Sequence, residues 1–335
     1  AEDLQVQWLQ LGAGKTAYDF PVYASQDLRQ LNPDTQRVIF VQHGAKRNAD
    51  DYYQAMAALV QPDQQTLIIA PAFLTQADPL AQTHTGPRWT AASWIQGLSP
   101  ATDKQGPATF QVYSDLLSAL RQQHPAPFRQ ILFTGHSGGA QFVQRFAMLN
   151  HADEALRAEG SDVRYVIANP SSYVYPDARR PVLSDSGQWR FTIPDAQQSA
   201  CPDWNHYKYG LQNLPPDAAA TQGDTITQRY LQRQIIYLLG EKDNDPQHPL
   251  LDKHCAAELQ GPHRLARGQG YWAFLTIKAQ ELGMASELTR YQRLLTIPDT
   301  GHDQRRMFRS PCVAALLKQG RLPAACSRDQ SPVRD

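Results

Sequence analysis

The sequence has no excess of either charge and no hydrophobic run long enough to cross a bilayer. Lysine plus arginine and aspartate plus glutamate number 32 each, so the formal net charge is +0. No basic tail or acidic run is present, which argues against nucleic acid or an anionic membrane surface as an electrostatic partner. Hydrophobic residues make up 41% of the chain but form no apolar stretch of about 20 residues, so no membrane span is expected.

Cysteine is scarce and lacks metal-binding spacing. No C-x-x-C pair occurs among the four cysteines, so a zinc site or thioredoxin-type redox motif is not expected. The four cysteines are Cys201, Cys255, Cys312 and Cys326. This number is consistent with two disulfides or with free buried thiols. The chain begins at Ala1 without methionine, as a mature exported protein does after signal-peptide removal, although a start chosen by an experimenter would look the same. We expect a secreted or periplasmic protein.

Two apparent ligand motifs lack a residue that their chemistry requires. The turn GAGKT at residues 12–16 resembles the end of a phosphate-binding loop, but the required glycine five residues before its Gly-Lys pair is Leu9. The acidic stretch around residues 243–252 lacks the glycine and terminal glutamate of a calcium-binding EF-hand loop. We therefore expect no cofactor and no metal.

The strongest signal for function is a serine between glycines. Residues 131–134 form a short apolar run typical of a buried strand, and apolar side chains then recur at helical spacing through residue 149. Between them, GHSGG at residues 135–139 has the strand–turn–helix context of a G-x-S-x-G nucleophile elbow. Such a sharp turn closes only over small neighbours, which the glycines are. An ordinary serine in a glycine-rich turn is the alternative, and we predict that Ser137 is a nucleophile.

Strands and helices alternate along the rest of the chain. This alternation predicts a single α/β domain, residues 1–335, with a mostly parallel central sheet covered by helices on both faces. Residues 171–229 lose the periodicity and collect aromatic side chains, so we expect an insertion that forms a cap or pocket wall. The expected strands are 4–10, 18–24, 37–42, 66–70, 163–168, 234–239 and 290–297, and the expected helices include 50–61, 264–282 and 304–318.

A serine hydroxyl needs a base within hydrogen-bond reach, and the base needs an acid to orient it. In parallel-sheet hydrolases these follow later strands, in the order serine, acid, histidine. His302 follows the last expected strand beside a glycine and is the best base. Asp243 follows the strand at 234–239 and is the preferred acid. Asp245 is the alternative acid, and Glu241 is a more distant one.

The oxyanion of an acyl-transfer reaction needs two convergent donors. We expect the backbone N–H groups of Gly138, directly after the nucleophile, and of Ala45, in the loop after the strand at 37–42. Four further side chains are candidates for the substrate pocket because of their places in the elbow, in the Trp-containing loop after residue 71 and after the strand at 163–168. They are His136, Trp94, Ser171 and Tyr173.

The positions of the cysteines suggest one pairing. Cys255 follows the acid loop and Cys312 follows the histidine loop, and these loops must meet at the active site. We therefore expect a Cys255–Cys312 bridge, which leaves Cys201 with Cys326, although four cysteines allow three connectivities.

These motifs resemble the α/β-hydrolase superfamily and, more narrowly, bacterial exported esterases related to polyhydroxybutyrate depolymerases and feruloyl esterases. The resemblance extends from about residue 38 to residue 317 and implies a serine hydrolase with Ser137, Asp243 and His302 in the motif positions. The segments that carry it are FVQHGAKRNADDYY near Phe40, GHSGGAQFVQRFA at Gly135, NPSSYVYPD at Asn169, LLGEKDNDP at Leu238, CAAELQGPHRLARG at Cys255 and DTGHD at Asp299.

The expected activity is hydrolysis of a carboxylic ester through an acyl-enzyme on Ser137. An amidase or peptidase would use the same three residues. A non-catalytic binding domain on a hydrolase scaffold is disfavoured, because the serine, acid and histidine are all present in order. The expected partner is a small-molecule or oligomeric ester substrate, and the sequence leaves the oligomeric state open.

Overall fold

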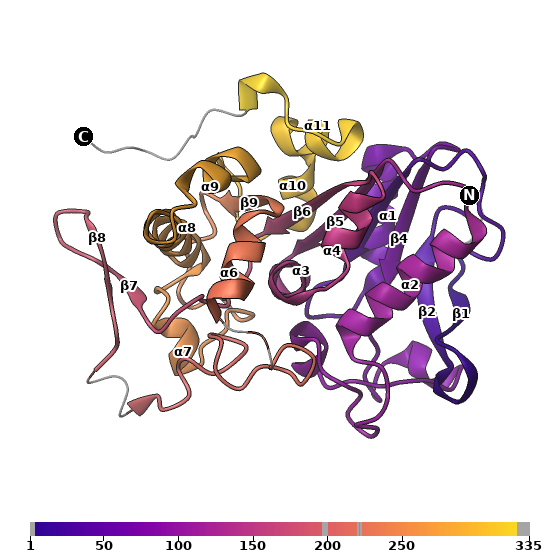
Figure 1. Ribbon diagram of the computed structural model, residues 1–335, viewed down its shortest axis with the longest axis horizontal. Helices are drawn as coiled ribbons and strands as arrows, with labels where there is room; N and C mark the ends of the chain where they lie inside the picture. The colour runs from indigo at the N-terminus through magenta and orange to yellow at the C-terminus, as the bar shows by residue number, and fades with distance from the viewer. Residues whose placement is uncertain (1–3, 196–199, 220, 222, 327–335) are drawn as a thin grey trace.

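The structure, a computed structural model, describes residues 4–195, 200–219, 221 and 223–326 (Figure 1). Within this part of the chain an eight-stranded sheet has the order β1-β2-β4-β3-β5-β6-β9-β10. The strands from β4 to β10 in this order run parallel to one another. Strand β2 is antiparallel to β4, and β1 is antiparallel to β2. The mostly parallel sheet is thereby confirmed. The strands are β1 Gln7–Leu11, β2 Tyr18–Ala24, β3 Arg37–Gln42, β4 Thr66–Pro71, β5 Gln130–His136, β6 Asp162–Ala168, β9 Gln234–Gly240 and β10 Gln292–Ile297.

Helices cover both faces of the sheet because the central strands are apolar on both sides. In β3, Val38 and Phe40 point into one core while Ile39 and Val41 point into the other. The first core is covered by α2 Thr109–Gln123, α3 Gly138–Leu149, α6 Gly223–Leu231, α8 Arg264–Glu281 and α9 Ala285–Tyr291. The second is covered by α1 Ala49–Val60, α10 Gln304–Arg309 and α11 Pro311–Gln319. Short helices α4 Asp153–Ala158 and α7 Cys255–Glu258 lie in connections.

Two predicted boundaries were wrong near the C-terminus. The strand expected from residue 290 begins at residue 292, because α9 continues through Tyr291. The single helix expected over 304–318 is divided into α10 and α11 at Ser310, whose backbone is extended (φ −60°, ψ 143°). Pro311 explains the break, since proline lacks an N–H and disfavours helical geometry in the residue before it.

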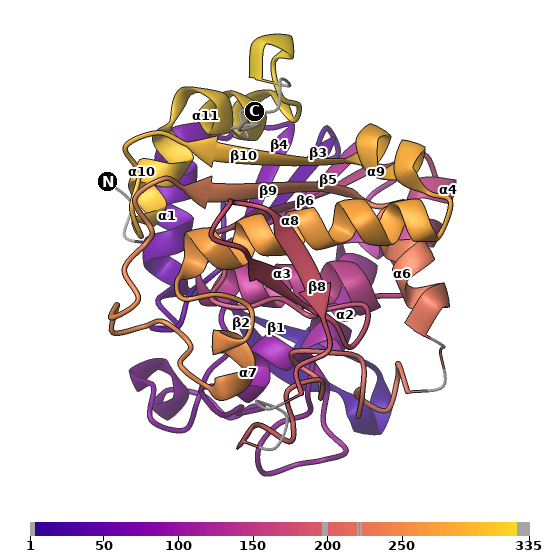
Figure 2. The same cartoon turned by 90° about the vertical axis from the view of Figure 1, so that its left-hand side faces the viewer.

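The segment 171–229 contains a short antiparallel hairpin, β7 Arg180–Leu183 with β8 Trp189–Thr192. Figure 2 shows this hairpin over the outer side of α8, where the ring of Phe191 packs 5.6 Å from that of Phe274. Residues 196–199, 220 and 222 of the predicted insertion lie outside the described residues.

The expected disulfide pairing was wrong. The bridges join Cys201 to Cys255 and Cys312 to Cys326. Cys312 lies in α11, which packs in the same core as α1, whereas Cys255 begins α7, which packs in a small cluster with Cys201 and Trp204. The chain therefore leaves the acid loop and the histidine loop in different directions, and in Figure 1 α11 lies along the upper edge whereas α7 lies at the lower left. No described helix is long and apolar enough to cross a membrane.

Candidate active site

Ser137 lies on a strained turn between β5 and α3. Its backbone has φ 59° and ψ −120°, a conformation that costs free energy in a residue other than glycine. A Cβ atom on Gly135 would lie 2.3 Å from the carbonyl oxygen of Gly139, and one on Gly139 would lie 2.4 Å from that of Gln42. The turn can therefore close only with glycine at both positions, and it holds the serine at the carboxyl end of the parallel sheet.

Three side chains from the ends of β5, β9 and β10 form a hydrogen-bonded series, hereafter the triad. His302 Nε2 lies 2.9 Å from Ser137 Oγ, and His302 Nδ1 lies 2.7 Å from Asp243 Oδ2. A carboxylate only accepts, so Nδ1 carries the proton and Nε2 is free to accept the serine proton. The alternative acid, Asp245, is exposed and its Oδ1 accepts from the N–H of Gln247 instead.

The loops that carry the acid and the base are joined through their backbones. The N–H of Lys242 donates to the carbonyl of Thr300 over 2.8 Å, and the N–H of Glu241 donates to that of Ile297 over 3.0 Å. Glu241 itself accepts from the N–H of Asp299. A Cβ on Gly240 would lie 2.4 Å from the oxygen of Thr300, so a glycine is needed where the two loops approach each other.

A buried arginine contacts the acid from the side away from the histidine. The Nη1 atom of Arg264 lies 3.5 Å from Asp243 Oδ1, and its Nε donates to Ser171 Oγ over 3.2 Å. Burial lowers the pKa of Arg264 and the charge of Asp243 raises it in part. Arg264 was not predicted, since one arginine at the start of a helix forms no sequence pattern.

The two predicted oxyanion donors are adjacent. A Cβ on Gly138, the first residue of α3, would lie 3.1 Å from the backbone nitrogen of Ala45. Among the described residues, neither N–H has a hydrogen-bond partner. The N-terminus of α3 adds its positive dipole end at this point. The arrangement can therefore stabilise negative charge beside Ser137.

His43 orients the peptide that carries the Ala45 N–H. Its Nε2 accepts from the N–H of Phe73 over 3.0 Å, so Nδ1 carries the proton and donates to the carbonyl of Gly44 over 3.0 Å. In a planar trans peptide the carbonyl and the following N–H point in opposite directions, so the Ala45 N–H points away from His43. Burial lowers the pKa of His43 to about 4, which keeps the ring neutral near pH 7.

All four predicted pocket side chains are buried, with exposed fractions of 0% to 3%. Trp94 packs 4.5 Å from the ring of His43, and the ring of His136 lies 4.7 Å from that of His302. Tyr173 stacks on Tyr271, and Ser171 is held by Arg264. Of the four, His136 packs directly against a triad residue, and the contact of all four with a ligand stays a prediction.

His248 lies beside the base. Its ring is half-buried and sits edge-on to that of His302, with centroids 4.9 Å apart. Burial and the nearby charges of Arg264 and His302 lower the pKa of His248.

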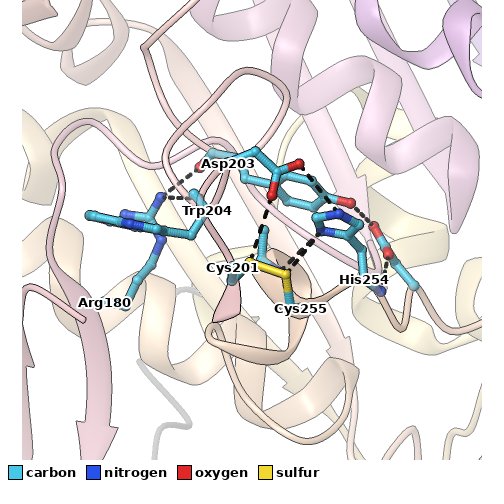
Figure 3. The surroundings of a disulfide bond; sticks show 9 residues. Arg180, Cys201, Asp203, Trp204, His254 and Cys255 are labelled. Atoms are coloured by element: carbon cyan, nitrogen blue, oxygen red, sulfur yellow. Dashed lines mark hydrogen bonds and ion pairs between the residues drawn. A yellow bond between two sulfur atoms is a disulfide. The ribbon is translucent and has the colours of Figure 1, made fainter. Parts of the chain in front are cut away.

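One cluster of the described residues has the donor types of a metal site. Potential ligand atoms of Cys201, Asp203, His254 and Cys255 lie within 4.8 Å of one another (Figure 3). Both sulfurs are joined in the disulfide, so only the carboxylate and the imidazole remain as donors. Structural zinc sites use four ligands, and the cluster in its oxidised form does not supply them.

A separate polar hollow of about 1120 Å³ lies between the turn at residues 12–16 and one side of α2, which lines it from Gln111 to Gln122. None of the triad residues lines it. The Gly-Lys turn itself forms only a three-residue 3₁₀ helix, Gly14–Thr16.

The chain is similar to solved hydrolase structures over nearly its whole length. The poly(3-hydroxybutyrate) depolymerase LpqC from Bordetella parapertussis is 22% identical, with a TM-score of 0.64 over 96% of this chain and 93% of that one. Poly(aspartic acid) hydrolase-1 from Sphingomonas sp. KT-1 is 25% identical, with a TM-score of 0.60 over 91% of this chain and 95% of that one. No protein-family model and no curated protein matches the chain.

These likenesses show that the chain has the α/β-hydrolase fold. The predicted resemblance to esterases of the depolymerase type is thus confirmed at the level of the fold.

Proposed function

We propose that this protein is a serine hydrolase that cleaves carboxylic esters through an acyl-enzyme on Ser137. The observation that carries the proposal is the continuous series from Ser137 Oγ through His302 to Asp243, with distances of 2.9 and 2.7 Å. The depolymerase neighbour on the same fold supports it.

In the first step, Ser137 Oγ attacks the acyl carbonyl and passes its proton to His302 Nε2. The new oxyanion accepts from the N–H groups of Gly138 and Ala45. His302 then gives the proton to the leaving alcohol, while Asp243 holds the imidazole and stabilises its charged form. Water, deprotonated by His302, releases the acid from Ser137 and restores the enzyme.

We also propose that residues 171–229 form one wall of the substrate site within a single domain. The Tyr207 hydroxyl donates to the carbonyl of Gln96, which lies in the loop that carries Trp94. The Lys208 ammonium lies 3.4 Å from Oε1 of Gln141, one helical turn after Ser137.

Two disulfides, which persist in oxidising compartments, support a secreted or periplasmic location.

Amide hydrolysis is the second candidate, because one neighbour is a poly(aspartic acid) hydrolase, and that polymer is joined by amide bonds. Matched pairs of p-nitrophenyl esters and p-nitroanilides with the same acyl group separate the two activities.

The deciding experiment is intact mass after incubation with a fluorophosphonate. One adduct on the folded wild type and none on Ser137→Ala is the expected result. A folded wild type that stays unlabelled and inert towards both substrate series would refute the proposal.

A further inference from the structure

Asn169 occupies the point where the three parts of the triad come together. It directly follows β6, which lies between β5 and β9 in the sheet. Strand β5 leads to Ser137 and β9 leads to Asp243. Asn169 is fully buried and has φ 50°, a left-handed conformation that asparagine tolerates better than most residues.

The side-chain oxygen of Asn169 holds the acid loop. The N–H of Gly240 donates to Oδ1 over 2.8 Å, and the carbonyl of Gly240 accepts from the N–H of Asp243 over 3.0 Å. The N–H of Asn169 also donates to the carbonyl of Leu238 in β9. The start of the turn that carries Asp243 is therefore fixed against β6.

The side-chain nitrogen of Asn169 holds the segments that carry Ser137 and His302. Because Oδ1 faces a donor, Nδ2 must be the atom that lies 3.2 Å from His136 Nε2 and 3.5 Å from the carbonyl oxygen of Gly301. His136 precedes Ser137, and its ring lies 4.7 Å from that of His302. Gly301 directly precedes His302.

This contact also selects the form of His136. Since Nδ2 donates, Nε2 of His136 must be unprotonated, so the ring is the neutral tautomer with its proton on Nδ1. Burial and the charges of His302 and Arg264 lower the pKa of His136, in agreement with a neutral ring. A neutral ring behind His302 does not oppose the positive charge that the base acquires during the reaction.

We propose that Asn169 is a positioning residue that holds the nucleophile, acid and base loops in one arrangement through a single buried amide. The inference rests on the proposed serine-hydrolase function. The site needs an acceptor, a donor and a left-handed backbone together. Aspartate lacks the donor, alanine lacks both groups, and the buried position leaves little room for the longer glutamine.

The test compares Asn169→Ala with Asn150→Ala as a matched control. Asn150 is also buried, and its amide bonds Phe146 and Tyr165 at the far end of α3, away from the triad. Removing either amide leaves partners unsatisfied and lowers Tm. Only Asn169→Ala should lower kcat for a p-nitrophenyl ester, by about ten- to a hundredfold, because it loosens the triad. KM should stay within about twofold, since no ligand contact is removed.

Asn169→Asp is the second variant, and it serves if the alanine variant does not fold. It keeps the acceptor for Gly240 and the backbone preference but loses the donor. His136 must then present a proton on Nε2 to the carboxylate, either as the other neutral tautomer or as the charged imidazolium, so kcat should fall and the pH–rate profile should change shape.

The inference is overturned if Asn169→Ala and Asn169→Asp keep the wild-type kcat and pH profile. It is also overturned if Asn169→Ala and Asn150→Ala lose kcat in the same proportion to their loss of Tm. Wild type is the reference in every assay. Failure of wild type to hydrolyse esters or amides or to react with a fluorophosphonate would instead contradict the proposed function, which keeps the two failures distinct.

Discussion

Mild acid is expected to destabilise this fold through His43. The ring is buried with its proton on Nδ1, and Nε2 accepts from the N–H of Phe73. A second proton would put two donors face to face and place a charge in an apolar site beside Trp94. The folded protein therefore resists protonation of His43, whereas the unfolded chain does not.

The size of the effect follows from the pKa of His43, lowered from 6.5 in a model peptide to about 4 in the fold. Above pH 6.5 the ring is neutral in both states, so stability is unaffected. As the pH falls from 6.5 to 4, the unfolded state gains a proton that the folded state does not bind. The shift of about 2.5 units corresponds to a loss of about 3 kcal/mol in the free energy of unfolding.

The assay is urea denaturation between about pH 7.5 and 4.5 on wild type, His43→Gln and His151→Gln. The first variant removes the buried titrating ring, and the second removes an exposed ring as a control. Wild type and His151→Gln should lose stability together, and His43→Gln should lose markedly less. Parallel curves for all three proteins would refute the argument that His43 is held neutral.

Three further outcomes are expected. Asp243→Asn should lower kcat on the order of 10³–10⁴-fold by disturbing the His302 tautomer, whereas Asp245→Asn should leave ester hydrolysis near wild type; the reverse result would exchange their roles. Ala45→Pro, which removes an oxyanion donor, should slow hydrolysis on the order of 10²–10³-fold while Ala45→Ser does not, and equal rates would exclude that N–H from the site. Replacing Cys201 and Cys255 with serine should lower the free energy of unfolding by about 4 kcal/mol, and replacing Cys312 and Cys326 should lower it by about 3 kcal/mol, because the first bridge closes a loop of 54 residues and the second one of 14. Urea denaturation compares the two variants, and a larger loss from the shorter loop would contradict the chain-entropy account.

The regular part of the fold could be predicted because each central strand carries a local pattern. An apolar run such as residues 37–42 is specified by burial on both faces, which requires no knowledge of its neighbours. The order Ser137, Asp243, His302 could likewise be derived, since the carboxyl ends of parallel strands meet at one edge. The geometry then brings these three side chains together.

The missed features depend on contacts between distant segments. The hairpin at residues 180–192 has two four-residue strands. One contains a proline, and the alternation of apolar and polar residues in the other is too short to indicate a strand. The disulfide pairing depends on which way α7 and α11 leave the sheet. Asn169 and His43 are single buried polar residues that depend on distant partners. Phe73 lies 30 residues from His43 in the chain, and Gly240 lies 71 residues from Asn169.

The separation of the triad residues along the chain sets the order in which reactivity can arise. Ser137 and His302 are 165 residues apart, and β10, which delivers the histidine, comes after every other strand in the described part of the chain. Until β10 pairs beside β9, Ser137 therefore has no base. An emerging chain with the elbow already folded would carry an inert hydroxyl, and hydrolytic competence would appear only with closure of the final edge of the sheet.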